Sequence, residues 1–141
     1  MLVRVVAIDV GRRRVGLAIS DPTRTLARPL STIPVSDTDA VELVAREVAR
    51  LAAEDDGVTL IVVGMPVGLD GSPTAQTAHV VQFIEALRAR TMIPIATEGE
   101  RLTSREAESR LAVNERDWRK RRQRLDAAAA AIILQDYLDR R

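Results

Sequence analysis

The sequence predicts an α/β fold in which a mixed sheet carries helices on its faces. Two observations predict it: three strand-like segments come first, and aliphatic strand-like segments then alternate with segments of helical periodicity. The 141 residues suit one domain, residues 1–141, with one substantial core. Aromatic residues make up only 2% of the chain, so Val, Leu, Ile and Ala must form that core.

The first three elements are predicted to form an antiparallel meander. Residues 3–10, VRVVAIDV, are nearly all apolar and β-branched, which is typical of a central strand buried on both faces. The sequence VGRRR can turn the chain, and residues 15–20 return as the hairpin partner. Residues 25–33 form a weaker strand, in which Pro29 indicates a sheet edge.

The middle of the chain alternates between helix and strand. A helix begins near Asp39, where apolar residues recur at helical spacing, and Asp37 or Thr38 can cap it. Residues 58–64, VTLIVVG, form a continuous aliphatic run, which indicates a buried parallel strand. Ser72 is expected to cap the next helix, with Pro73 at its first position.

The last third supplies one strand and two helices. Residues 93–98 read as a strand, and a capping box predicts a short helix over 103–111. A helix of high intrinsic propensity is predicted over 125–138, with a row of alanines that permits close packing.

Composition excludes several classes of protein. The chain has no cysteine, which excludes a disulfide framework and a thiolate zinc site. Asp9 interrupts the first apolar run too early for a signal peptide, and no apolar segment reaches membrane-spanning length. We therefore expect a cytoplasmic protein with no membrane partner.

Three carboxylates stand out by their position. Asp9 ends the first strand, Glu100 follows the strand over 93–98, and Asp126 lies in the first turn of the last predicted helix. Strand carboxyl ends converge on one edge of such a sheet, where sites form. Clustered carboxylates without Cys or His suit Mg²⁺ or Mn²⁺, and two such ions about 3.5–4 Å apart can promote phosphodiester hydrolysis.

Each acid also has a structural alternative. Asp9 can cap the turn through Gly11 or pair with a nearby arginine, and Asp126 suits the positive end of a helix dipole. Glu100 can be a solvated loop acid, and Glu98 competes with it for a role in the site.

Basic charge is concentrated in two short segments. Residues 116–124, RDWRKRRQR, carry six cationic side chains against one aspartate, and three arginines follow the first strand. Such segments favour nucleic-acid binding, although both can also be solvated loops.

Trp118 can stack on an unpaired base or pin the loop to the core. The helix start near Ser72 can offer N–H groups to a phosphate or can be only a tight turn. The predicted nucleic-acid-binding residues are Arg12, Arg13, Arg14, Ser72, Thr74, Trp118, Arg119, Lys120, Arg121, Arg122 and Arg124. The lone His79 is expected to be an ordinary surface residue.

Four segments together resemble one family. AIDVGRRRVGLAISD, IVVGMPVGLDGSPT, ERLTSREAESRL and LDAAAAAIIL occur in the order and spacing of the YqgF/RuvX family, which belongs to the ribonuclease H-like superfamily and is related to RuvC resolvases. The resemblance implies a five-stranded mixed sheet of order 3-2-1-4-5 flanked by helices. It also implies a divalent-metal nuclease that processes the 5′ end of pre-16S rRNA.

The family's acidic positions fall on Asp9, Glu100 and Asp126, as catalytic and metal-binding residues for Mg²⁺ or Mn²⁺, two ions in all. The chain departs from the family at Gly99, where an acid is common. Arg122 and Arg124 stand where lysines are common, which keeps the charge and favours forked phosphate contacts.

Three functions remain open at this point. A nuclease acting on structured RNA is the leading interpretation. A Holliday junction resolvase of RuvC-like type acts on structured DNA junctions and needs two active sites, so the choice between monomer and homodimer stays open. A non-catalytic RNA-binding factor in transcription or ribosome assembly would use the basic segments but would not require the three acids.

Overall fold

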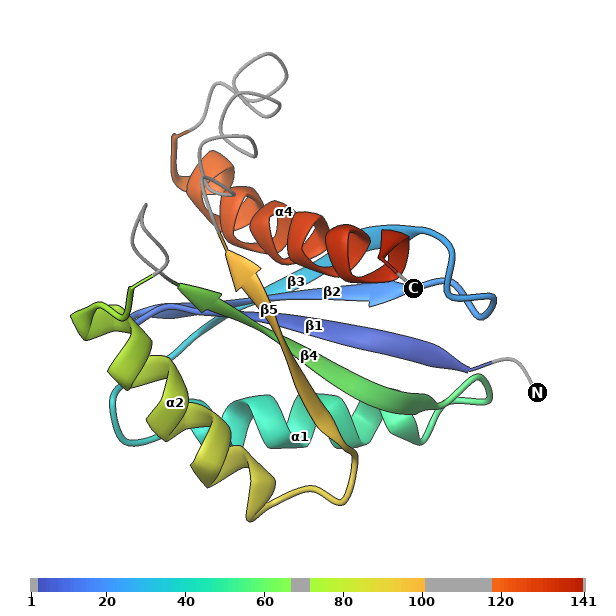
Figure 1. The fold of residues 1–141 in the computed structure, drawn as a ribbon, viewed down its shortest axis with the longest axis horizontal. Helices are drawn as coiled ribbons and strands as arrows, with labels where there is room; N and C mark the ends of the chain where they lie inside the picture. Colours follow the sequence, from blue (N-terminus) through green and yellow to red (C-terminus); the bar gives the residue numbers. More distant parts are fainter. Residues whose placement is uncertain (1–2, 67–71, 101–117, 141) are drawn as a thin grey trace.

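A computed structural model describes residues 3–66, 72–100 and 118–140 of the chain (Figure 1). Within these ranges the side chains of Glu100 and of residues 118–125 are not described. The short helix predicted over 103–111 and the first two residues of the basic segment lie outside the described residues.

The sheet has five strands in the order β3-β2-β1-β4-β5. The strands are β1 (Arg4–Val10), β2 (Arg14–Ser20), β3 (Ala27–Pro34), β4 (Val58–Pro66) and β5 (Ile95–Glu100). The β1–β2 and β2–β3 pairs are antiparallel, whereas β1–β4 and β4–β5 are parallel. The predicted mixed sheet and its order are confirmed, and β3, which contains Pro29, is an edge strand as predicted.

Helices cover both faces of the sheet. Figure 1 shows α4 (Trp118–Asp139) on one face, and α1 (Ala40–Ala52) and α2 (Ala75–Arg88) on the other. Successive residues of β1 alternate between the two layers. Val6 and Ile8 join the cluster beneath α1 and α2, whereas Val5 and Ala7 join the cluster beneath α4. The prediction that this strand is buried on both faces is therefore confirmed.

Two helix starts differ from the prediction. The N-cap of α1 is Asp39, not Asp37 or Thr38, and its carboxylate accepts a bond from the Ser36 N–H at 2.6 Å. The N-cap of α2 is Thr74, so Ser72 does not cap the helix and Pro73 precedes it.

The physical reason for the second difference is a reciprocal pair of hydrogen bonds. Thr74 Oγ1 accepts from the Thr77 N–H at 3.3 Å, and the Thr74 N–H donates to Thr77 Oγ1 at 2.8 Å. The residue three positions after Ser72 is Ala75, whose side chain has no oxygen to complete a capping box.

The last helix begins seven residues earlier than predicted. It starts at Trp118, so most of the basic segment lies in helix and not in a loop. Arginine, lysine and glutamine are good helix formers, which explains this extension. Asp126 is consequently the ninth residue of α4, in its third turn. No helix within the described ranges is long and apolar enough to cross a bilayer.

Candidate functional site

The turn between β1 and β2 holds the end of the first strand in place. The Gly11 N–H donates to the Arg14 carbonyl at 3.0 Å, which closes the hairpin. A Cβ on Gly11 would lie 2.5 Å from that carbonyl oxygen, so only glycine fits here. Asp9 lies two residues before the turn and pairs across the ladder with Gly16.

Gly16 brings α4 onto the sheet. A Cβ at this position would lie 2.1 Å from the Asp126 carbonyl oxygen, so the helix backbone occupies the space that any other side chain would need. Asp9 lies two residues after Ala7 and four after Val5, which face α4, and therefore points to the same side of the sheet. The close approach of α4 to Gly16 thus brings Asp9 and Asp126, which are distant in the sequence, to one place.

Asp126 is held by an arginine of the hairpin. Arg14 Nε donates to Asp126 Oδ2 at 2.6 Å, and both side chains are about a quarter to a third exposed. The helix-dipole explanation loses its support, because that effect falls off within the first turn and Asp126 lies in the third. The carboxylate is instead oriented by a charge-assisted hydrogen bond across the β2–α4 contact.

Glu100 lies at the same edge of the sheet as Asp9. It is the last residue of β5 and pairs with Pro66, so it lies within the strand and not beyond it as predicted. The β1–β4 ladder continues to Ile8–Val63, which puts Asp9 level with Gly64, the partner of Glu98. Ordinary strand spacings then separate the Asp9 and Glu100 Cα atoms by about 12 Å.

That separation suits carboxylates that share one or two hard cations. An aspartate side chain, a glutamate side chain and a cation between them, with cation–oxygen bonds of about 2.1 Å, can span this Cα–Cα distance. Among the residues with described side chains, no group of three or more Asp, Glu, His or Cys can hold a metal ion. The Glu100 side chain is outside that set, so the predicted ligands fit by backbone position and donor chemistry.

Glu98 has a different environment from the other acids. Its side chain is 6% exposed, and its Oε2 lies 3.0 Å from Nη2 of Arg140 at the end of α4. A buried carboxylate of this kind depends on its cation. The arrangement gives Glu98 an ion pair that connects β5 to α4.

The predicted nucleic-acid-binding residues surround this edge. Arg12 and Arg13 are exposed at the hairpin turn, whereas Arg14 is half-buried against Asp126. Residues 118–124 form the first turns of α4, and their side chains are not described. Ser72 and Thr74 precede α2, which is fixed at this edge by a Gln76 Nε2 bond to the Val10 carbonyl at 3.2 Å.

The start of α2 offers fewer donors than predicted. The capping box uses the N–H groups of Thr74 and Thr77, and Thr77 Oγ1 also donates to the Pro66 carbonyl at 2.5 Å. The capping box therefore occupies the Thr74 and Thr77 N–H groups, and Thr77 joins the helix start to β4.

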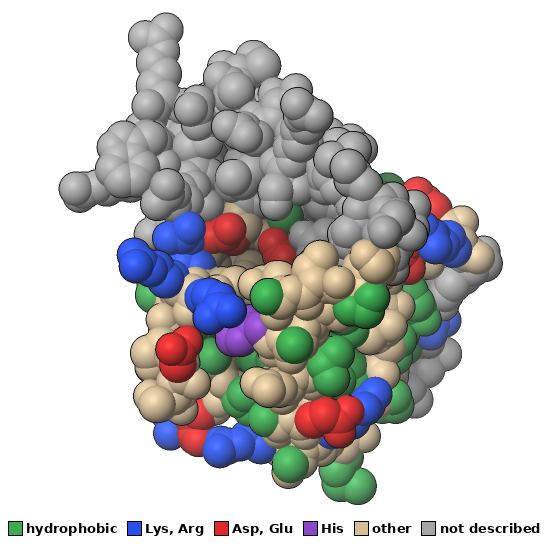
Figure 2. Space-filling model, turned by 60° about the vertical axis from the view of Figure 1, so that its left-hand side comes forward, with side chains coloured by type: hydrophobic (Ala, Val, Ile, Leu, Met, Phe, Trp, Pro, Cys, Tyr) green, Lys and Arg blue, Asp and Glu red, His purple; other side chains and the backbone are tan. Residues whose placement is uncertain are grey.

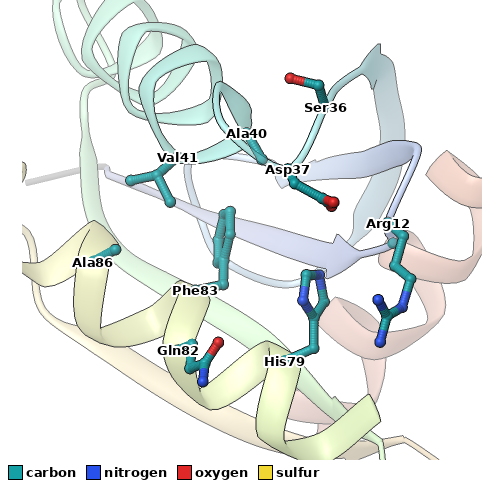
Figure 3. A pocket seen from close by; sticks show the side chains of 10 residues that line it. Arg12, Ser36, Asp37, Ala40, Val41, His79, Gln82, Phe83 and Ala86 are labelled. Carbon is teal, nitrogen blue, oxygen red and sulfur yellow. The ribbon is translucent and has the colours of Figure 1, made fainter. Parts of the chain in front are cut away.

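A pocket that the sequence does not predict lies on the opposite face of the sheet. The pocket has a volume of about 350 Å³ and lies between the β1–β2 turn, the start of α1 and one face of α2 (Figure 3). His79, expected on an open surface, is half-buried and lines it together with Arg12 and Phe83. No local sequence pattern predicts this pocket, because its residues come from three separate parts of the chain.

The strand order and the helix crossing at Gly16 define a ribonuclease H-like fold, and solved structures agree. The chain superposes on "T. thermophilus RuvC in complex with Holliday junction substrate" with a TM-score of 0.56, at 17% identity, over 96% of this chain and 93% of that one. It superposes on the fowlpox virus Holliday junction resolvase with a TM-score of 0.54, at 12% identity, over 97% and 98%. At these identities the likeness concerns the fold alone.

The sequence comparison gives the family. The family model RuvX, described as Holliday junction resolvase, matches residues 3–140, and this chain belongs to that family. A relative from Roseiflexus sp. (strain RS-1), named "Putative pre-16S rRNA nuclease", is 43% identical over 137 residues, 96% of this chain and 94% of its own. A relative of the same name from Anaeromyxobacter dehalogenans (strain 2CP-1 / ATCC BAA-258) is 43% identical over 141 residues, 98% of each chain. The resemblance read from the four sequence segments is confirmed.

Proposed function

We propose that this protein is a divalent-metal-dependent nuclease that hydrolyses phosphodiester bonds in structured RNA, during 5′-end processing of pre-16S rRNA in the cytoplasm. The names of relatives 43% identical over nearly the whole chain support the substrate. The single observation that carries the proposal is the contact of α4 with Gly16, which brings Asp126 beside the strand end that bears Asp9.

In this proposal Asp9, Glu100 and Asp126 hold two Mg²⁺ or Mn²⁺ ions. Such ions, when bound, activate a water and stabilise the leaving oxygen. The protein supplies hard oxygen donors on three separate elements and needs no side-chain nucleophile. That chemistry agrees with a chain that has no cysteine and one histidine, which lies on the other face of the sheet.

The basic residues act on the substrate strand. Arg12 and Arg13 at the turn, together with the cations at the start of α4, attract the phosphate backbone. Arg14 forms an ion pair with the Asp126 carboxylate and competes with cations for it. Neighbouring arginines of one hairpin thus attract the phosphate backbone and bind one of the proposed metal ligands.

A junction resolvase is the second candidate, favoured by the description of the family model. Symmetric cleavage of a four-way DNA junction needs two active sites at a fixed separation, hence a homodimer. Cleavage rates on a four-way junction and on single-stranded and structured RNA distinguish the two. Faster cleavage of RNA by a monomer supports the first proposal, and paired cuts in a junction by a dimer support the second.

The catalytic proposal is tested by Asp9→Asn. We expect Mn²⁺-dependent cleavage to be abolished while RNA affinity stays the same or increases, because the substitution removes one negative charge from the site. Cleavage is measured with an end-labelled RNA, and binding with the same RNA in EDTA. Asp56→Asn, an exposed acid in the α1–β4 loop, serves as the matched control and should cut like the parent. If Asp9→Asn cuts as fast as the parent, the catalytic assignment is wrong, and the non-catalytic RNA-binding alternative gains support.

A further inference from the structure

The pocket on the α1 and α2 face carries an inference beyond catalysis. Its lining combines an apolar floor, one cation and several hydrogen-bonding groups, and its volume of about 350 Å³ is at the lower end of ligand sites. Ten residues line it: Gly11, Arg12, Ser36, Asp37, Ala40, Val41, His79, Gln82, Phe83 and Ala86.

One face of α2 forms a wall of the pocket. His79, Gln82, Phe83 and Ala86 follow the spacing at which side chains share a helix face. The two rings are four residues apart, so they lie one above the other, and Figure 3 shows both directed toward the start of α1. Phe83 is 5% exposed and forms the apolar floor of the pocket, while Ala86 leaves room beside it.

The polar groups of the pocket are available to a ligand. Within the described part of the chain, no hydrogen bond or ion pair engages the side chains of Arg12, Asp37, His79 or Gln82. In Figure 3 the Asp37 carboxylate faces the α2 wall, and Arg12 lies at the end nearest the β1–β2 turn. Figure 2 shows the histidine in a hollow of the surface with basic side chains beside it.

The pocket adjoins the acids without sharing their face. Arg12 follows Asp9 by three residues, so their Cα atoms are at most about 11 Å apart. Val10, between them, belongs to the cluster beneath α1 and α2, whereas Asp9 faces α4. A strand whose phosphate lies at Asp9 can therefore pass over the Gly11–Arg12 turn and reach the pocket within one or two nucleotides.

We propose that this pocket binds one unpaired base of the substrate strand, adjacent to the scissile phosphate. This inference rests on the proposed nuclease function and adds a base-binding subsite to it. The His79 imidazole supplies the stacking surface above the apolar floor formed by Phe83. Asp37 and Gln82 hydrogen-bond the base edge, and Arg12 contacts the attached phosphate. Aromatic surfaces stack on any base, whereas an aspartate beside an amide discriminates among base edges.

The first test uses the single histidine of the chain as a spectroscopic probe. Uridine or adenosine 5′-monophosphate, titrated into the metal-free protein, should shift the His79 imidazole Hε1 resonance saturably, whereas inorganic phosphate and ribose 5-phosphate should not. Equal shifts with phosphate alone would show that the pocket recognises only the anion, and the proposal would be wrong.

The second test places the base within a strand. A single abasic site is moved along a single-stranded RNA, and affinity is measured by fluorescence anisotropy in EDTA. At one position the abasic site should weaken binding to the parent about tenfold, within the range of stacking contributions. His79→Ala should weaken binding of the intact strand by a similar factor and remove the effect of the abasic site.

The control for these binding measurements is a substitution on α2 outside the pocket. Val81→Ala alters an exposed residue of α2 that does not line the pocket, and it should bind both strands like the parent. Additive losses from His79→Ala and the abasic site, or equal affinity at every abasic position, would overturn the proposal, even if mononucleotides bind. Because these measurements need no metal, they can fail while the Asp9→Asn test succeeds, and the reverse.

Discussion

Arg4 and Arg14 occupy opposite ends of the β1–β2 hairpin and have very different surroundings. Arg4 is 9% exposed and donates to the carbonyls of Leu51 and Gly57 and to the Glu54 carboxylate, at 3.0–3.1 Å. Arg14 is more exposed and makes one short bond, to Asp126.

The difference separates a structural arginine from one at a site. Arg4 joins the end of α1 to the start of β1 through these three bonds. Arg14 binds a carboxylate that the proposed function requires for cations, so its contact competes with a ligand. We call the Arg4 end of the hairpin the closed end, because its arginine is buried and makes three bonds. We call the Arg14 end the open end, because its arginine is partly exposed beside the proposed site.

The largest expected change in stability comes from a substitution at Gly16, where α4 contacts the open end of the hairpin. Gly16→Ala puts a Cβ 2.1 Å from the Asp126 carbonyl oxygen, so α4 must move away from β2. We expect a loss of about 3 kcal/mol or more in the free energy of unfolding, since this clash is with backbone and not with a flexible side chain. Urea denaturation measures the stability, and Mn²⁺ binding by calorimetry should weaken because Asp9 and Asp126 are moved apart.

Gly99→Ala is the matched control for this substitution. A Cβ at Gly99 meets nothing within 4 Å, so the change in stability should stay within about 0.5 kcal/mol. If Gly16→Ala is as stable as Gly99→Ala and binds Mn²⁺ like the parent, the approach of α4 to β2 is not what assembles the site.

This dependence on Gly16 also shows where sequence reasoning stops. The burial of β1 on both faces, the edge position of β3 and the order of elements follow from local patterns, and all were predicted. The clash at Gly16 depends on a residue 110 positions away, and the Arg14–Asp126 bond joins residues 112 positions apart. A single sequence shows a glycine and an arginine in a hairpin but not which helix lies upon them.

The errors at helix ends have a local cause. Ser72 and Thr74 both carry a capping hydroxyl, and the choice depends on the reciprocal bond from Thr77. A cluster of cations suggests a loop, but the high helix propensity of these residues extends α4 to Trp118. The position of Asp9 near a strand end follows from a local pattern, whereas the ion pair of Asp126 with Arg14 does not.

The closed end is tested by Arg4→Met, which keeps most of the side-chain volume and removes the donors. The Gly57 carbonyl then loses its arginine donor, and the Leu51 carbonyl keeps the Glu54 N–H, so we expect a loss of about 2 kcal/mol in the free energy of unfolding. Mn²⁺ affinity should not change. Arg46→Met is the control, because its pair with Glu42 is at the surface and should contribute less than about 0.5 kcal/mol. A change in Mn²⁺ affinity without loss of stability would contradict the structural role of Arg4.

The smallest expected change in stability belongs to Arg14→Gln, at the open end. Its half-exposed pair with Asp126 should contribute less than about 1 kcal/mol to folding. Its guanidinium nevertheless repels any cation that shares the Asp126 carboxylate, so removing it should tighten Mn²⁺ binding about five- to tenfold. Calorimetry or the electron paramagnetic resonance of free Mn²⁺ measures this affinity.

Arg13→Gln is the control. Arg13 lies in the same turn, is exposed and forms no ion pair within the described residues. Its removal should change Mn²⁺ affinity less than about twofold, because solvent screens an exposed charge. Weaker Mn²⁺ binding by Arg14→Gln would instead mean that the arginine prepares the carboxylate for the metal, and the distinction between the two ends of the hairpin would then rest on orientation and not on competition for charge.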